Sequence, residues 1–186
     1  LNNPAEDAFV YLADGEYNLT KDVNVGDYAI EVNGAEAVVN GHGHTITGGS
    51  EGNYAIITKG DDSSLTMHAD IVSYGGGYGV TGGANLTIDG GLIDVRTDVQ
   101  SGRYNIYAVD EGTFVTVNGG TFKFDTSKQN RRAYIYAGAG ATVLVKGGTF
   151  GKPSTRTDYK AGIMGNGTVI VTGGTFGFNP TKWVAA

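Results

Sequence analysis

The side chains best suited to chemistry in this sequence are histidines and aspartates that stand near glycine-rich strings. A histidine beside a carboxylate can transfer a proton or bind a metal ion, and two carboxylates at a suitable separation are the machinery of glycosidases. In "DVRTD" the charged residues alternate, so they would share one face of a strand. An enzyme built on this chain would draw on six residues: His42, His68, Asp70, Asp89, Asp94 and Asp98.

The same six residues also fit a purely structural role, which we favour. Asn, Asp and His are common at solvent-facing corners, where they hydrogen-bond locally. Alternating charges are typical of the solvent side of a strand. The sequence therefore predicts no catalytic residue, no metal site and no cofactor, and it leaves an enzyme as the alternative if the six side chains converge in one groove.

A second group of side chains is basic and concentrated in one part of the chain. Residues 1–122 hold 17 acids and 4 bases, whereas residues 123–160 hold 2 acids and 8 bases. The segments "SKQNRR" and "GKPSTRTDYK" are expected to lie side by side as an attachment edge, which would meet an acidic protein surface or the acidic half of a neighbouring copy. Two solvated loops are the simpler alternative. The attachment edge comprises Lys128, Arg131, Arg132, Lys152, Arg156 and Lys160.

The composition limits the class of protein further. The net charge of −6 argues against nucleic acid as a partner, because phosphate binding needs a concentrated basic surface. The sequence has no cysteine, which excludes disulfides and thiolate metal sites. Its apolar runs are too short to cross a bilayer, so we expect no membrane insertion. The chain opens with Leu1, which indicates a removed leader or a fragment of a longer protein.

The elements that must position these side chains come from an internal repeat. "VTVNGGTFKFD", "VLVKGGTFGKP" and "VIVTGGTFGFN" begin at residues 115, 143 and 169, and "NLTIDGGLIDV" is an earlier copy. Two degenerate copies, "AVVNGHGHTIT" and "SLTMHADIVSY", precede them. In this alignment His68 lies one coil below Asp89, and His42 lies one coil below Asp70.

Each repeat contains three short segments with the apolar–polar alternation of a strand that has one buried face. Such a unit cannot bury its apolar face alone, so it must stack on its copies. The sequence therefore predicts an all-β fold, a single-stranded right-handed parallel β-helix of about six coils. Gly-Gly marks the corner between the second and third strands, where a Cβ does not fit.

Two columns of stacked side chains follow from this alignment. The apolar residues after the Gly-Gly pair are expected to form one column: Phe122, Phe150 and Phe176, with Leu92 and Ile46 earlier. Tyrosines at the start of the first strand are expected to form another: Tyr28, Tyr54, Tyr78 and Tyr104. The tyrosine column either seals a corner, which we favour, or offers an exposed ladder on which sugars stack.

The ends of such a rod are sheet edges, which aggregate unless they are covered. Residues 1–15 are expected to form an N-terminal cap with a short helix, for which Asn3 is the N-cap and Pro4 the first helical residue. Residues 16–178 form the coils, and residues 179–186, with Trp183, form a C-terminal lid. We expect residues 1–186 to be a single β-helix domain.

These strings resemble those of known families. "VNGHGHTITGG" is similar to the opening coils of right-handed parallel β-helix proteins of the pectin-lyase-like superfamily. The closing "GGTFGFNPTKWV" resembles the endings of non-enzymatic GGTF-repeat surface proteins of phages and bacteria. The likeness covers about residues 9 to 184, and no catalytic motif comes with it. It implies a non-enzymatic structural protein on the surface of a phage virion, as a capsid decoration protein or a fibre module.

Two alternatives to this function remain open. One is a bacterial cell-surface adhesin or repeat module with the same fold, and the other is a polysaccharide-binding or polysaccharide-degrading β-helix enzyme. The expected partners are a protein surface such as a capsid and other copies of the chain, as a homotrimer, since the rods of such phage proteins often associate side by side. Glycans are a further candidate partner. The expected location is the virion surface or, in the alternative, the bacterial surface or the extracellular space.

Overall fold

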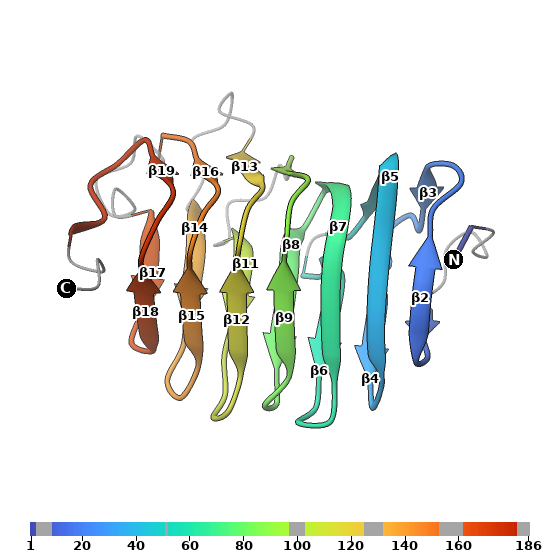
Figure 1. The fold of residues 1–186 in the computed structure, drawn as a ribbon, viewed down its shortest axis with the longest axis horizontal. Coiled ribbons are helices and arrows are strands. Elements are labelled where there is room, and N and C mark those ends of the chain that lie inside the picture. Colours follow the sequence, from blue (N-terminus) through green and yellow to red (C-terminus); the bar gives the residue numbers. More distant parts are fainter. Residues whose placement is uncertain (3–8, 51, 97–102, 125–131, 153–161, 182–186) are drawn as a thin grey trace.

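The computed structural model describes residues 1–2, 9–50, 52–96, 103–124, 132–152 and 162–181. In this part of the chain the protein is a parallel β-solenoid without α-helices. The chain climbs along the near sheet, passes behind at the top and descends along the far sheet as it advances towards the C-terminus, which is a right-handed path (Figure 1). The predicted all-β parallel β-helix is confirmed.

The far sheet in Figure 1, sheet A, supplies the first strand of every coil. Its seven strands are, in spatial order, β1 (Val10–Leu12), β4 (Ile30–Asn33), β6 (Tyr54–Lys59), β8 (Gly76–Thr81), β11 (Arg103–Ala108), β14 (Arg132–Ala137) and β17 (Ile163–Gly165). The register between them places one residue per strand in a column: Val10, Ile30, Ile56, Tyr78, Ile106, Ile135 and Ile163. Each strand is therefore equivalent to the next, as a stacked repeat requires.

The second sheet, sheet B, has twelve strands and covers the other two faces of each coil. They are β2 (Gly15–Asn18), β3 (Val23–Asn24), β5 (Glu36–Gly48), β7 (Ser64–Ser73), β9 (Asn85–Ile88), β10 (Leu92–Val95), β12 (Phe114–Val117), β13 (Thr121–Phe124), β15 (Thr142–Val145), β16 (Thr149–Phe150), β18 (Thr168–Val171) and β19 (Thr175–Phe176). The long strands β5 and β7 run through both faces without a break. They therefore join the two halves into one sheet.

The Gly-Gly corner explains why each later coil has two separate strands in sheet B, whereas β5 and β7 are each a single continuous strand. The second glycine of each pair has a positive φ, from 90° at Gly91 to 107° at Gly174, a region that glycine adopts most readily. The strand ends before each pair and restarts after it. In β7 the pair is replaced by Ala69-Asp70, and the strand passes straight through. The predicted corner role of Gly-Gly is confirmed.

The interior column behind these corners is aliphatic in the early coils and aromatic in the late ones. Its members are Ile46, Ile71, Ile93, Phe122, Phe150 and Phe176. The phenylalanines stack with ring centroids 4.5 and 4.9 Å apart and nearly parallel planes. The prediction was right for Ile46 and the phenylalanines but wrong for Leu92, which pairs with Thr121 and lies in the neighbouring row.

The amino end differs from the prediction. Val10–Leu12 is strand β1, paired with β4, so the capping helix does not extend over these residues; residues 3–8 lie outside the described part. The solenoid has about five turns rather than six. The coils from β4 to β16 are paired on both sides, and β1–β3 and β17–β19 form the two ends. The predicted cap over residues 1–15 therefore contains a strand of the first coil. Trp183 and the rest of 182–186 also lie outside the described residues.

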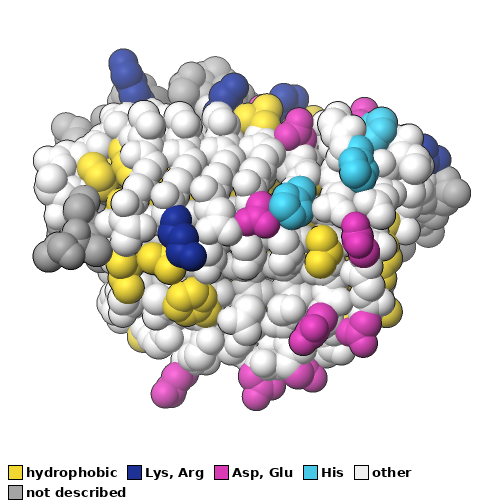
Figure 2. Space-filling model, in the orientation of Figure 1, with side chains coloured by type: hydrophobic (Ala, Val, Ile, Leu, Met, Phe, Trp, Pro, Cys, Tyr) yellow, Lys and Arg dark blue, Asp and Glu magenta, His cyan; other side chains and the backbone are white. Residues whose placement is uncertain are grey.

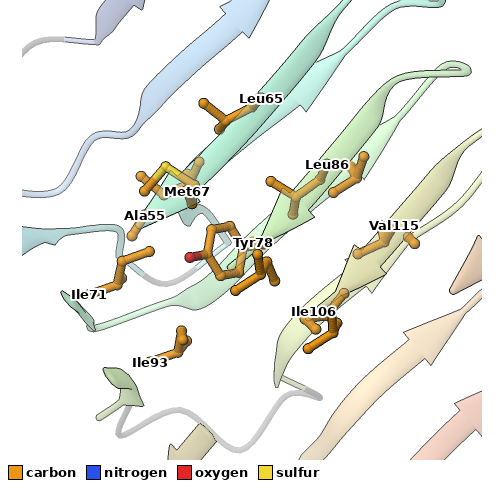
Figure 3. Packing of buried hydrophobic residues seen from close by; sticks show 14 of the residues in the cluster. Ala55, Leu65, Met67, Ile71, Tyr78, Leu86, Ile93, Ile106 and Val115 are labelled. Carbon is orange, nitrogen blue, oxygen red and sulfur yellow. The ribbon is translucent and has the colours of Figure 1, made fainter. Parts of the chain in front are cut away.

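Tyr78 interrupts the isoleucine column of sheet A. Register pairs it with Ile56 and Ile106, so it is not equivalent to Tyr54, whose register partner is Gly76. Its hydroxyl points into the core on the side of Met67 and Ile71 (Figure 3). The residue is fully buried, and its hydroxyl has no hydrogen-bond partner within the described chain. An unpaired polar group in an apolar core lowers stability.

We expect Tyr78→Phe to stabilise the protein by about 1 kcal/mol, because the substitution removes an unpaired buried hydroxyl and keeps the ring. Tyr134→Phe is the matched control. Tyr134 is also buried, but its hydroxyl donates to the carbonyl oxygen of Lys152 at 2.9 Å, so its loss should cost about 1 kcal/mol. Urea denaturation of both variants measures the difference. A destabilised Tyr78→Phe would show that the hydroxyl has a favourable interaction.

Burial also makes the two tyrosines sensitive to alkali. It raises the pKa of Tyr134 to about 12, and it raises the pKa of Tyr78 further, with a smaller contribution from Asp70. Tyrosine in an unfolded chain ionises near pH 10. The unfolded state therefore releases these protons at lower pH than the folded state, and the free energy of unfolding falls as the pH rises above about 10. We expect the melting temperature to fall from pH 9 to pH 11, and less steeply in Tyr78→Phe; equal slopes would contradict this origin.

Candidate functional site

Two of the candidate residues, His68 and Asp89, lie in one outward row on sheet B, here called the polar row. Register across the sheet aligns seven residues that follow or end its strands: Asn18, Asn40, His68, Asp89, Asn118, Lys146 and Thr172. All seven are polar. Figure 2 shows histidine and acidic side chains on this near face, over the early coils.

His68 and Asp89 are neighbours in the polar row, as predicted. The Nε2 atom of His68 lies 3.2 Å from Oδ2 of Asp89, and both side chains are partly exposed. The other carboxylate oxygen of Asp89 accepts a hydrogen bond of 2.5 Å from Nδ2 of Asn118 in the next coil. Both oxygens of Asp89 are thus held by the coils on either side. The arrangement can exchange a proton with solvent, and it also ties three coils together.

His42 does not lie below Asp70. The register of β5 and β7 shifts between Asn40 and Thr45, and Thr45 is the residue opposite Asp70. The string "GHGH" therefore holds more inserted residues than the alignment allowed, and His42 itself has a positive φ of 51°. Its Nε2 is 2.8 Å from Oδ1 of Asn18.

Because of these inserted residues, His42 and Asp70 contact different neighbours and not each other. Asp70 accepts a hydrogen bond of 2.8 Å from the backbone N–H of Leu92 in the next coil, a structural role at the corner. His44, in the same insertion, has Nδ1 3.5 Å from Oδ1 of Asp22. The same Asp22 oxygen accepts the backbone N–H of Thr45 at 2.9 Å. Each of these side chains is engaged with its own neighbour.

Asp94 lies beyond the corner, on β10. Its Oδ2 is 2.8 Å from Nε of Arg96, and this hydrogen bond raises the pKa of the Arg96 guanidinium above its usual value. Asp98, the second carboxylate of the predicted pair, lies outside the described residues. Among the described residues, no three His, Asp or Glu side chains gather in a way that could hold a metal ion. The five described candidates are therefore distributed over several local contacts.

The attachment edge is described only in part. Strands β13 and β16 are neighbours, so the two basic segments do leave equivalent strands of adjacent coils. Lys152, after β16, is exposed, and Arg132 is the first residue of β14. Lys128, Arg131, Arg156 and Lys160 lie outside the described residues. Attachment through this edge stays a prediction.

Sequence reasoning missed an outward row on sheet A, here called the aromatic face. Its members, one per strand, are Tyr11, Glu31, Ile57, Gly79, Tyr107, Tyr136 and Met164. The strings "YNIYAV" and "AYIYAG" held the signal, because alternation turns their second tyrosine outward. Ring centroids of Tyr107 and Tyr136 are 5.2 Å apart, and Tyr54 reaches Tyr107 at 5.5 Å.

The only charged member of the aromatic face is neutralised. Glu31 is 5% exposed, and its Oε1 lies 2.7 Å from Nζ of Lys59. It sits between Tyr11 and Ile57 in the register. A carboxylate withdrawn from water in this way needs such a partner. The other six members of the aromatic face carry no charge.

No protein-family model matches the chain, and no curated protein or solved structure matches it either. The likeness to pectin-lyase-like and GGTF-repeat proteins therefore depends on the quoted strings and on the parallel β-helix fold alone. No helix of the described residues is long and apolar enough to cross a membrane.

Proposed function

We propose that the chain is a non-enzymatic structural protein of the outer surface of a phage virion, a capsid decoration protein or a fibre module of the GGTF-repeat kind. The observation that carries the proposal is the stacking register of sheet A, which continues without a shift from β1 to β17. One register runs across all seven strands of sheet A, and the polar row follows a single register as well. A continuous ladder across the described strands suits a part whose task is mechanical.

The way in which the candidate residues are used supports the same proposal. Asp70 holds the backbone of the next coil, and Asp89 links the coils on either side of it. Asp94 is paired with Arg96. Side chains that bridge coils stabilise the stack, whereas a glycosidase needs two carboxylates that face a common substrate. The proposed partners are other copies of the chain and an acidic protein surface such as a capsid, met by the attachment edge.

A second candidate function is a polysaccharide-active enzyme, and one observation favours it. His68 and Asp89 are within hydrogen-bond distance at a partly exposed site, which is the geometry of a general acid–base pair. A bacterial cell-surface adhesin or repeat module would use the same fold as the virion protein, so only its location separates the two.

Immunogold labelling with an antibody against the chain tests the location. Phage particles and cells from the culture that encodes the chain are labelled side by side. Gold on the capsid or tail of purified particles is the expected result. Gold confined to the bacterial envelope would replace the virion proposal by the adhesin, and gold on neither would contradict both.

A further inference from the structure

We propose that the aromatic face of sheet A is the surface through which copies of this chain pack against one another. The inference rests on the proposed structural role and goes beyond it by naming the contact surface. The face runs across all seven strands of sheet A. Tyr11 at its amino end is 68% exposed, although it is a large aromatic side chain. A largely uncharged, aromatic row of this kind on the outside of a protein marks an interaction site.

Aromatic side chains are concentrated in this row, although Tyr74 and Phe114 are also exposed elsewhere on the molecule. The polar row of sheet B occupies the outside of the same coils, and each of its seven members is polar or charged. An outer surface selected only for solubility would carry similar residues on both sheets. Tyrosine is enriched at protein–protein contacts because its ring is apolar and its hydroxyl stays hydrated.

The tyrosines are already fixed in place before any partner binds. The ring of Tyr54 lies over β8, where an added Cβ at Gly79 would come within 2.7 Å of it and one at Gly76 would overlap it. The rings of Tyr104 and Tyr136 are 5.0 Å apart, and those of Tyr107 and Tyr136 are inclined by only 14°. Little side-chain entropy is then lost on association.

This packing favours a protein occupant over a sugar. Neighbouring rings cover part of each other's faces, because centroids near 5 Å with nearly parallel planes correspond to offset stacking. A sugar ring stacks on a free aromatic face, and the tyrosines in the middle of this row offer mainly edges and hydroxyls. A long apolar strip of edges suits a second, equally flat sheet.

Charges at the two borders of the face favour another copy of the same chain. Strands of sheet A begin with bases in two adjacent coils, since Arg103 and Arg132 are the first residues of β11 and β14 and are register partners. The turns that follow β6 and β11 carry exposed acids: Asp61, Asp62, Asp110 and Glu111. Figure 2 shows acidic side chains along the lower border, where these turns lie.

In the coils of β11 and β14, bases at the start of the strands and acids in the turn after β11 give the two borders opposite charges, which makes this part of the face self-complementary. A second copy that lies alongside with its coil axis in the same direction can place its basic border against the acidic border of the first. This contact closes as a two-fold pair or as a three-fold ring, depending on the angle between the faces. Seven strands spaced ~4.8 Å apart, each of about five residues, give each copy a flat footprint of roughly 500 Å². Two such footprints reach the lower limit of about 1,000 Å² for a specific interface.

Sedimentation velocity over a concentration series tests the inference. The native chain should form a dimer or trimer whose dissociation constant is measurable in such a series. Tyr107→Glu with Tyr136→Glu should leave it monomeric at every concentration, with an unchanged far-ultraviolet circular dichroism spectrum. Leu144→Glu is the matched control, because Leu144 is a half-buried residue of β15 and belongs to sheet B. This control should associate like the native chain.

If the tyrosine variant does not fold, a pair of charge-reversal substitutions tests the same interface. Glu111→Lys should weaken association at least several-fold at low salt, and adding Arg132→Glu should restore it. A native chain that is monomeric throughout would overturn the inference, as would an oligomer indifferent to both sets of substitutions. An oligomer of that second kind would leave the proposed virion role intact, because immunogold labelling tests the role separately.

Discussion

Gly91→Ala should cost about 3 kcal/mol of stability or more, whereas Gly90→Ala should cost almost nothing. The two glycines are adjacent in the chain, but only the second is constrained. Gly91 has a φ of 90°, and a Cβ added there would overlap the carbonyl oxygen of Ala69 in the preceding coil. A Cβ at Gly90 would meet no atom within 4 Å.

Chemical denaturation of the two variants measures this difference directly. Gly90→Ala is a sensitive control because it also reduces the freedom of the unfolded chain, which stabilises slightly where the conformation is compatible. Similar losses in both variants would show that the corner does not depend on a positive φ at its second residue. The role of Gly-Gly in the fold would then have to be reassigned.

Phe150→Ala should be the second most damaging substitution, with a loss of about 3–5 kcal/mol. Phe150 is 1% exposed and lies in the middle of the aromatic column, with Phe122 on one side and Phe176 on the other. Tyr134 also contacts it edge-on, with ring centroids 5.9 Å apart. Truncation leaves a cavity that the coils cannot close without breaking their register.

Phe114→Ala serves as the control for Phe150→Ala. Phe114 belongs to β12 in the neighbouring coil, but it is 37% exposed and faces outward. We expect it to change the free energy of unfolding by about 0.5 kcal/mol. If thermal or urea denaturation gave equal losses for the two variants, the aromatic column would not be the centre of the core.

The architecture was predictable because the repeat consists of short sequence patterns that each indicate a local structure. Alternation fixed the strands, and the Gly-Gly pairs fixed the corners. Phe122, Phe150 and Phe176 lie in one column because each follows its pair at the same distance. In a stacked fold, equal spacing in the sequence becomes equal position in space.

The errors occurred where a coil departs from the repeat. His42 follows an insertion whose length cannot be assigned without a partner strand, so its predicted neighbour was wrong. The repeat aligns Tyr78 with Tyr54, because the neighbouring strings also begin with tyrosine. Its register partner is instead Ile56, two residues further along. The string "YGVTG" gives no sign that its tyrosine fills an isoleucine position in the core.

The sequence predicted one contact between two candidate side chains, but it did not predict the aromatic face. His68 and Asp89 were placed together by the repeat alone. The aromatic face was missed because tyrosines were counted at the start of each string, whereas its central members, Tyr107 and Tyr136, come three residues later. Whether a side chain points inward or outward depends on the residue at which its strand begins after the corner. That residue is known only from the folded structure.

The central claim, that this β-helix is structural and not catalytic, is tested most directly with the purified chain and a panel of acidic and neutral polysaccharides. New reducing ends and unsaturated products are measured for the native chain and for His68→Asn with Asp89→Asn and Asp94→Asn. We predict no products above the blank from either protein. Products formed by the native chain and lost in the triple variant would contradict the claim and establish an enzyme.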